Sequence, residues 1–395
     1  MEFNLFSFFI SGVKKEVLPD SDLWQLPLSG KNIGKSGDSD FTTGHYYLAA
    51  CRFLSKDNFS VLQTALKSFS SLKPCSGKSG HDTSVMADQI VRIEVYLEKH
   101  GAFYHPLKIQ VILHSNQTCL FVLNGAVSKQ GISFIRNEYE LLLKLNKNQL
   151  RSYLPQIYGF DFISMDGVRV GFFLGQWFDN YKEFHVSDDN GTRQISIWDS
   201  DGSCYYIQVG DSFEIYQQIA GILTYYYNIE TFEQIASWHH AAGDFIINME
   251  GDKLSVRLIT IRAYLPVTQL GVGEDDQTTY ILPSLLFFFL NMTIRMRLDR
   301  LNGTSKIVMI DGLVLNEIIK GFLSALDDKS VIYDYGNLRS AFIEFFVQFE
   351  EEQIFDIATN NVESNYSDPL EITLIEANLE THCRTLYSIF KNIEK

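Results

Sequence analysis

The sequence predicts an α+β fold of two lobes, with a small antiparallel sheet in the first and mainly helices in the second. The 395 residues exceed one ordinary domain, and 46% are hydrophobic, including 30 Phe and 20 Tyr, which suffices for large cores. Short β-like apolar runs gather between residues 104 and 176, whereas apolar residues three and four apart dominate after residue 211. This change of period divides the chain into the two lobes.

Charge and composition restrict the class of protein. The chain has 33 Lys and Arg against 48 Asp and Glu, and its net charge of −15 opposes binding to nucleic acid or to anionic membranes. Five scattered cysteines without a C-x-x-C spacing predict reduced thiols. Glu2 stands where a secretory signal needs basic residues, and Pro283, Asn291 and Arg295 interrupt the most apolar later run before the about 20 residues that span a bilayer. We therefore expect a cytoplasmic protein.

Residues 1–99 are expected to form a leader and a helical extension. The beginning is rich in Gly, Ser, Asp and Lys, which is typical of a poorly ordered arm. Apolar residues three and four apart predict helices at 46–70 and at 84–99. Two Gly-Lys-Ser triplets, at 34–36 and 77–79, lack the first glycine of the pattern G-x-x-x-x-G-K-[ST], so neither predicts a nucleotide site.

Residues 100–182 are predicted to form the small α+β lobe. "LKIQVILH" and "CLFVLNGAV" surround the turn-like "SNQ", which predicts a hairpin. "ISFIRNEYELLLKLN" then has helical period and carries Glu138. Two further strands are expected on either side of the turn at Asp166 and Gly167. Residues 183–210 are polar with short β pieces and would connect the lobes.

The second lobe, 211–395, is predicted to be mainly helical. Asp211 or Ser212 can cap its first helix. Further helices are expected at 278–301, 310–327, 338–353 and 368–394. A β-hairpin interrupts this pattern, since "DFIIN" and "KLSVRLITI" lie on either side of a turn at Gly251. Asp244 stands at the start of the hairpin after Gly243, and a carboxylate held on such a turn can accept a proton or bind a metal.

This order of elements resembles the protein-kinase-like superfamily, most closely its aminoglycoside phosphotransferase and choline kinase type. The resemblance covers roughly residues 100–330. Within 238–264, "HAAGDFIINM" is similar to the family's catalytic loop H-G-D-x-x-x-x-N through His240, Gly243 and Asp244, with two alanines inserted. The resemblance implies ATP and Mg²⁺ between the lobes, with His240 and Asp244 as catalytic residues. Asp244 would position or deprotonate the hydroxyl of the acceptor.

The same resemblance implies roles for four further residues. Glu138 would organise the ATP site of the small lobe. Asn124 stands at the position of the family's ATP-binding Lys, and Lys129 follows shortly after the strand. Asn248 is the nearest candidate for the Mg²⁺ ligand, although it lies one position before the family's Asn. The second metal-binding residue, an Asp expected near 260–262, is missing.

Three functions follow as hypotheses. The first is an ATP-dependent phosphotransferase whose acceptor, a small molecule or a protein, is unknown. The alternative is a catalytically silent, pseudokinase interaction module, which Asn124 and the missing Asp favour. The third is a metal-dependent hydrolase using His239, His240 and Asp244, because His and Asp are zinc ligands. Structural roles stay open beside these, with Asp244 as a turn residue and Glu138 on a solvated helix face.

Overall fold

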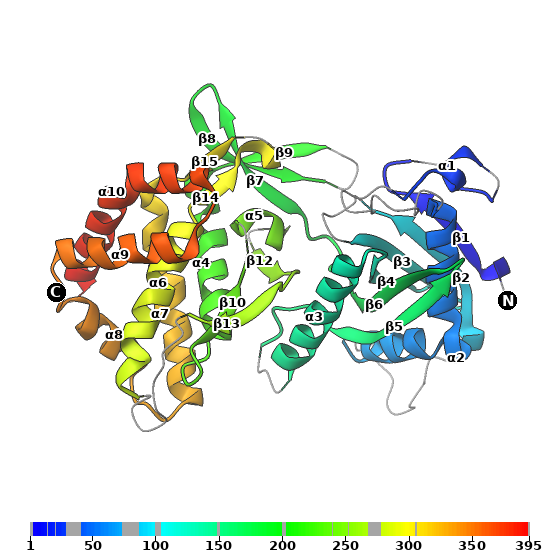
Figure 1. The fold of residues 1–395 in the computed structure, drawn as a ribbon, viewed down its shortest axis with the longest axis horizontal. Helices are drawn as coiled ribbons and strands as arrows, with labels where there is room; N and C mark the ends of the chain where they lie inside the picture. Colours follow the sequence, from blue (N-terminus) through cyan, green and yellow to red (C-terminus); the bar gives the residue numbers. More distant parts are fainter. Residues whose placement is uncertain are drawn as a thin grey trace. The chain divides into compact units, whose positions relative to one another are not determined.

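The computed structural model describes residues 3–13, 15–19, 21–28, 41–72, 87–98, 104–147, 151–199, 203–238, 240–251, 253–267, 278–304 and 306–393. The chain divides into two compact units, Met1–Asp179 and Asn180–Lys395 (Figure 1). A six-stranded sheet forms the first unit and helices dominate the second, which confirms the α+β class. Among the described residues, no helix is long and apolar enough to cross a membrane.

The sheet of the N-terminal unit has the strand order β1-β2-β3-β4-β6-β5. Its strands are β1 (Phe6–Ile10), β2 (Ile90–Leu97), β3 (His105–Leu113), β4 (Thr118–Ala126), β5 (Ile157–Met165) and β6 (Val168–Gln176). The two predicted strand pairs, β3 with β4 and β5 with β6, are confirmed. The expectation of an antiparallel sheet is wrong at one edge, because β1 runs parallel to β2. A parallel pair needs a crossover, and two consecutive helical segments between the strands, broken at Lys56–Phe59, supply it.

The helix predicted for residues 84–99 is wrong, because most of this stretch forms β2. Ile93, Val95 and Leu97 point into the core, while Glu94 and Tyr96 alternate with them on the other face. This alternation has the period of a strand. The same stretch also has apolar residues at helical spacing, so pairing with β1 and β3 decides between the two structures.

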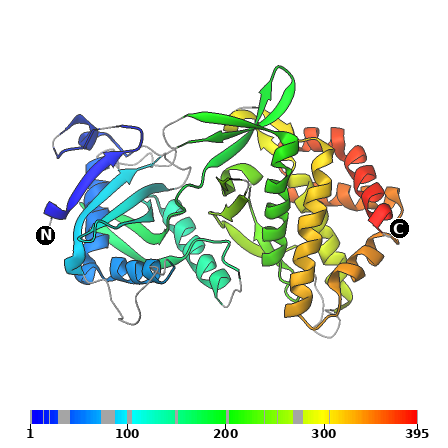
Figure 2. The same cartoon turned by 180° about the vertical axis from the view of Figure 1, so that it is seen from behind.

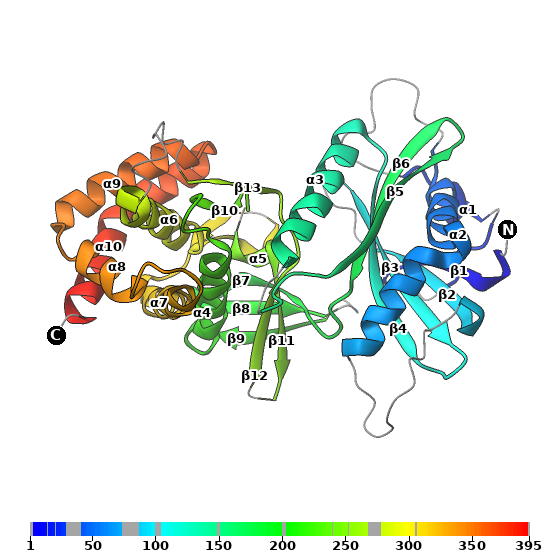
Figure 3. The ribbon, with the colours of Figure 1, turned by 90° about the horizontal axis from the view of Figure 1, so that it is seen from below.

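Helices cover both faces of this sheet, α2 (Thr43–Leu72) on one and α3 (Lys129–Asn146) on the other (Figure 3). Both helices were predicted. Neighbouring residues of β6 show the arrangement, because side chains alternate between the faces of a strand. The Phe172 ring lies 5.4 Å from the ring of Tyr46 in α2, and the Phe173 ring lies 6.1 Å from the ring of Tyr139 in α3. A short helix, α1 (Asp22–Gln25), packs against α2.

The C-terminal unit begins with the sheet of β7 (Glu183–Asp189), β8 (Thr192–Trp198) and β9 (Cys204–Gln208). Its longer helices are α4 (Val209–Tyr226), α6 (Ile281–Arg295), α7 (Leu315–Ile332), α8 (Leu338–Phe346), α9 (Glu351–Asn365) and α10 (Pro369–Ile393). Two short strands, β14 (Leu298–Arg300) and β15 (Ile307–Met309), pair beside them. The predicted helices are present, but several bounds differ. Residues 298–300 of the predicted helix 278–301 form β14, and α9 lies mostly beyond the predicted helix 338–353. Gln208 rather than Asp211 or Ser212 precedes the first turn of α4, and a break at 347–350 separates α8 from α9.

Helices α4 and α7 lie side by side in the C-terminal unit (Figure 2). They approach closely at two glycines, Gly221 of α4 and Gly321 of α7. A methyl group added to Gly321 would lie 2.0 Å from the backbone oxygen of Gln217, whereas one added to Gly221 would meet its nearest atom at 3.6 Å. The packing distance of the two helices therefore depends on the missing side chain of Gly321.

A buried lysine joins the ends of the same two helices. Lys329, near the end of α7, donates hydrogen bonds to the backbone oxygens of Tyr225 and Tyr227, where α4 ends. These oxygens have no partner within a helix, so the lysine satisfies them. Burial disfavours the charged form and lowers the pKa of Lys329 to about 7, against the opposing influence of Asp328.

We expect Lys329 to make the free energy of unfolding rise between pH 7 and pH 10. In this range the unfolded chain keeps the proton, because its lysine titrates near its ordinary value, while the folded chain has lost it. The folded state therefore gains stability with rising pH, by at most about 1.4 kcal/mol per pH unit. Urea unfolding of wild type and Lys329→Met at several pH values measures this slope. An equally steep slope in both proteins would contradict the assignment.

Candidate functional site

Four short strands and one turn build the region that contains His240 and Asp244. The hairpin β11 (Phe245–Glu250) and β12 (Lys253–Leu258) confirms the predicted hairpin, with Gly251 at its turn in a left-handed conformation, φ +61°. Next to it, β10 (Glu233–Ala236) pairs with β13 (Ala263–Pro266). The turn α5 (Ala241–Asp244) leads into β11, and Gly243 takes φ +91° there, a conformation that suits glycine.

Asp244 is buried and forms an ion pair with Arg262. Its side chain is 2% exposed, and that of Arg262 is 30% exposed. Arg262 Nη1 donates to Asp244 Oδ2 at 2.7 Å, and Arg262 Nη2 lies 2.7 Å from Asp244 Oδ1. Both carboxylate oxygens therefore lie close to one guanidinium group, and the contact with Oδ2 has the geometry of a hydrogen bond, whereas the contact with Oδ1 is an ion-pair contact alone. The backbone oxygen of Asp244 also accepts a hydrogen bond from Ile259 at 3.0 Å, which joins the turn to the end of the hairpin.

His240 is buried close by but has a different partner. Its Nε2 lies 3.2 Å from Oε1 of Glu371, at the start of α10. Arg295 of α6 also binds the segment that precedes His240. It donates hydrogen bonds to the backbone oxygens of Trp238 and of Asn365 at the end of α9. The histidine thus joins the turn to the helices of its unit, as expected of a structural side chain.

The predicted metal ligand Asn248 lies apart from Asp244. It belongs to strand β11, opposite Ser255 of β12, and is half-buried. Four residues of extended strand span roughly 13 Å, so the short side chains of Asp244 and Asn248 do not reach a common ion. Within the residues that the structure describes, no three His, Cys, Asp or Glu side chains are grouped to hold a metal. His239 lies outside the described residues.

The three residues implied for ATP lie in the N-terminal unit. Asn124 is half-buried in β4, opposite Phe173 of β6. Glu138 is buried on α3 together with Ile135, so it does not belong to a solvated face. Lys129 is exposed at the first residue of α3. Nine residues of helix separate it from Glu138, roughly 13 Å along the axis, so the two do not form an ion pair.

Sequence reasoning missed two charged partners in the C-terminal unit, Arg262 and Glu371. Arg262 is the last residue of "LITIR", where an acidic residue was expected and absent, and a charge at the end of an apolar strand was the available signal. Glu371 gave no local signal, because it pairs with a residue 131 positions away. The Gly-Lys-Ser triplets at 34–36 and 77–79 lie outside the described residues.

The site thus combines the buried carboxylate of Asp244 with the guanidinium group of Arg262. Arg262 occupies the space beside both oxygens of this carboxylate, so a metal ion or an acceptor hydroxyl that approached from the same side would have to displace it. Comparison of the chain with protein-family models finds no match, and comparison with curated proteins finds none either.

Proposed function

We propose that the chain is a kinase-like binding module that does not transfer phosphate. The observation that carries this proposal is the ion pair of Asp244 with Arg262. By the resemblance to kinase-like proteins, Asp244 corresponds to the catalytic base and Arg262 falls where a metal-binding Asp is expected. A guanidinium at this position repels Mg²⁺ and holds the Asp244 carboxylate in an ion pair.

The remaining substitutions support the same proposal. Phosphoryl transfer depends on groups that position ATP and neutralise its charge, chiefly a lysine and Mg²⁺. Asn124 replaces the lysine, and the chain has no acidic residue between Lys253 and Gly273 to bind the metal. Asn248 lies roughly 13 Å along the strand from Asp244, too far to share an ion with it.

A phosphotransferase is the second candidate. It is favoured by the order of elements, a sheet with the buried Glu138 on α3 and then a helical unit with Asp244 at the start of a hairpin. The partial exposure of Arg262 also allows its side chain to turn away. Asp244 would then act as the base on the acceptor hydroxyl, with ATP as phosphate donor.

Thermal unfolding with and without Mg²⁺ and ATP separates the two candidates. For a silent module we expect no rise of the midpoint and no transfer from labelled ATP to acceptors such as choline, an aminoglycoside or casein. A ligand at 100 times its Kd would stabilise the folded state by about 2.7 kcal/mol, so binding would be visible. Asp244→Asn is the matched control, because it keeps the shape of the side chain. Transfer by the wild type that is lost in Asp244→Asn would overturn the proposal.

A further inference from the structure

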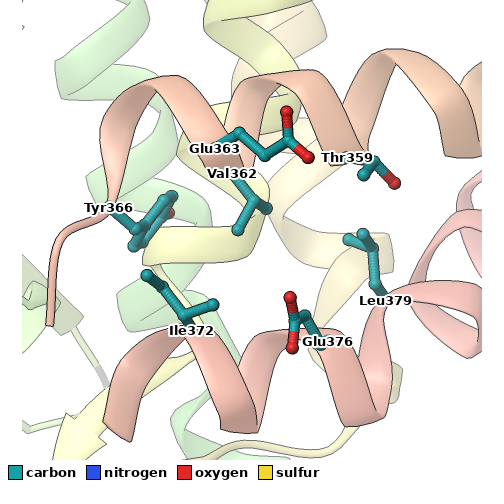
Figure 4. A pocket seen from close by; sticks show the side chains of 7 residues that line it. All are labelled: Thr359, Val362, Glu363, Tyr366, Ile372, Glu376 and Leu379. Atoms are coloured by element: carbon teal, nitrogen blue, oxygen red, sulfur yellow. The ribbon is translucent and has the colours of Figure 1, made fainter. Parts of the chain in front are cut away.

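Helices α9 and α10 enclose an open groove on the C-terminal unit (Figure 4). We call it the α9–α10 groove, with a volume of about 210 Å³. Three apolar side chains line it, Val362 of α9 and Ile372 and Leu379 of α10. Glu376 projects from α10 toward the gap between the helices, the Glu363 side chain lies along α9 beside the gap, and both are exposed. The groove therefore has an apolar base and two carboxylates at its margin.

No cation among the described residues neutralises the two carboxylates. Within the described part of the chain, neither Glu363 nor Glu376 forms an ion pair. Two other acidic residues of the same helices do have a cationic partner, because Arg384 binds Glu351 at 3.2 Å and Glu380 at 2.5 Å. Two like charges beside one apolar groove repel each other, and a cation placed between them would relieve this repulsion.

The negative charge continues along α9 beyond the groove. Glu352, Asp356 and Glu363 are exposed and are spaced four and seven residues apart, which places them on one face of the helix. Between Arg339 and Arg384 the sequence contains no Lys or Arg. A single small cation would occupy only the groove, whereas a segment with several basic residues would also match this stripe.

We infer that the α9–α10 groove binds a basic segment of a partner protein. A lysine or arginine of that segment would lay its aliphatic stem on Val362, Ile372 and Leu379 and place its charge between Glu363 and Glu376. Further basic residues would follow the acidic stripe of α9. This inference rests on the proposed role as a binding module and names the chemistry of its partner.

The test measures binding of a fluorescein-labelled peptide of repeated Lys-Leu-Lys to the full chain by fluorescence anisotropy. Exposed ion pairs contribute little individually, so E363Q/E376Q should weaken binding about fivefold, which corresponds to about 1 kcal/mol for the two pairs together. The matched control D334N/E344Q removes the same charge from exposed positions outside the groove and should change binding less than about twofold. Because all four side chains are exposed, circular dichroism should show folded proteins.

Three results would overturn the inference. Absence of peptide binding to the wild type would exclude the groove as a docking site for such segments. Equal weakening by both double variants would show attraction to the net charge of the protein alone. Displacement of the peptide by spermidine at comparable concentration would indicate a site for small amines. Phosphate transfer from ATP would instead overturn the proposed function and leave the peptide result unchanged, so the two failures are distinguishable.

Discussion

Replacing Gly321 with alanine is expected to lower the free energy of unfolding by about 3 kcal/mol, because the new methyl group has no space. It would lie 2.0 Å from the backbone oxygen of Gln217 and 3.2 Å from the Cβ atom of Ala220, both on α4. A backbone oxygen moves only with its helix, so α4 and α7 must separate. The gain in helix propensity from alanine is about 1 kcal/mol and does not offset this loss. Urea unfolding followed by circular dichroism measures the difference.

Gly221 provides the control for this substitution on the facing helix. Its added methyl group would lie 3.6 Å from the backbone oxygen of Gly321, an ordinary contact distance. Gly221→Ala should therefore leave the stability unchanged or raise it by up to about 1 kcal/mol. Similar losses in the two variants would show that general crowding between the helices, rather than the contact at Gln217, controls this packing.

Arg262→Ala is expected to destabilise the chain by about 3 kcal/mol, because it leaves the carboxylate of Asp244 buried without its ionic partner. The reverse substitution, Asp244→Ala, should have a smaller effect of about 1 kcal/mol. The difference arises from exposure, since the Asp244 side chain is 2% exposed and that of Arg262 is 30% exposed. When Asp244 is removed, Arg262 can turn its charged end toward water, whereas Asp244 stays buried when Arg262 is removed.

The double variant Asp244→Ala/Arg262→Ala completes the comparison. It removes both charges, so it should be more stable than Arg262→Ala alone. Denaturant unfolding of the four proteins yields the coupling energy of the pair. A double variant whose loss of unfolding free energy equals the sum of the single losses would show that the two side chains do not interact. The proposal that Arg262 keeps Asp244 from acting in phosphate transfer would then be wrong.

Local patterns in the sequence predicted much of the fold. The helix α3 has apolar residues at helical spacing, and the hairpin β11–β12 has short apolar runs on either side of a turn at Gly251. Asp244 was singled out by its position after Gly243, and His240 by the resemblance to the kinase-like catalytic loop. Such features depend on residues close together in the chain, so a single sequence contains the necessary information.

Features that depend on distant residues were not predicted. Strand β2 satisfies both the helical and the strand period, and its neighbours β1 and β3 in the sheet decide for a strand. The partner of His240 is 131 residues away, and Arg262 is 18 residues from Asp244. The ion pair with Arg262 decides which chemistry is open to the Asp244 carboxylate, and the local sequence around Asp244 does not reveal this contact.

The sequence by itself therefore determined the α+β class, most elements and the position of one conspicuous acidic residue. Only the tertiary structure decided that β1 and β2 pair in parallel, that Gly321 sets the spacing of α4 and α7, and that Arg262 holds Asp244. The physical reason is the range of the interactions. Periodicity and turn preferences act over a few residues, whereas burial and ion pairing depend on which distant segments the folded chain brings together.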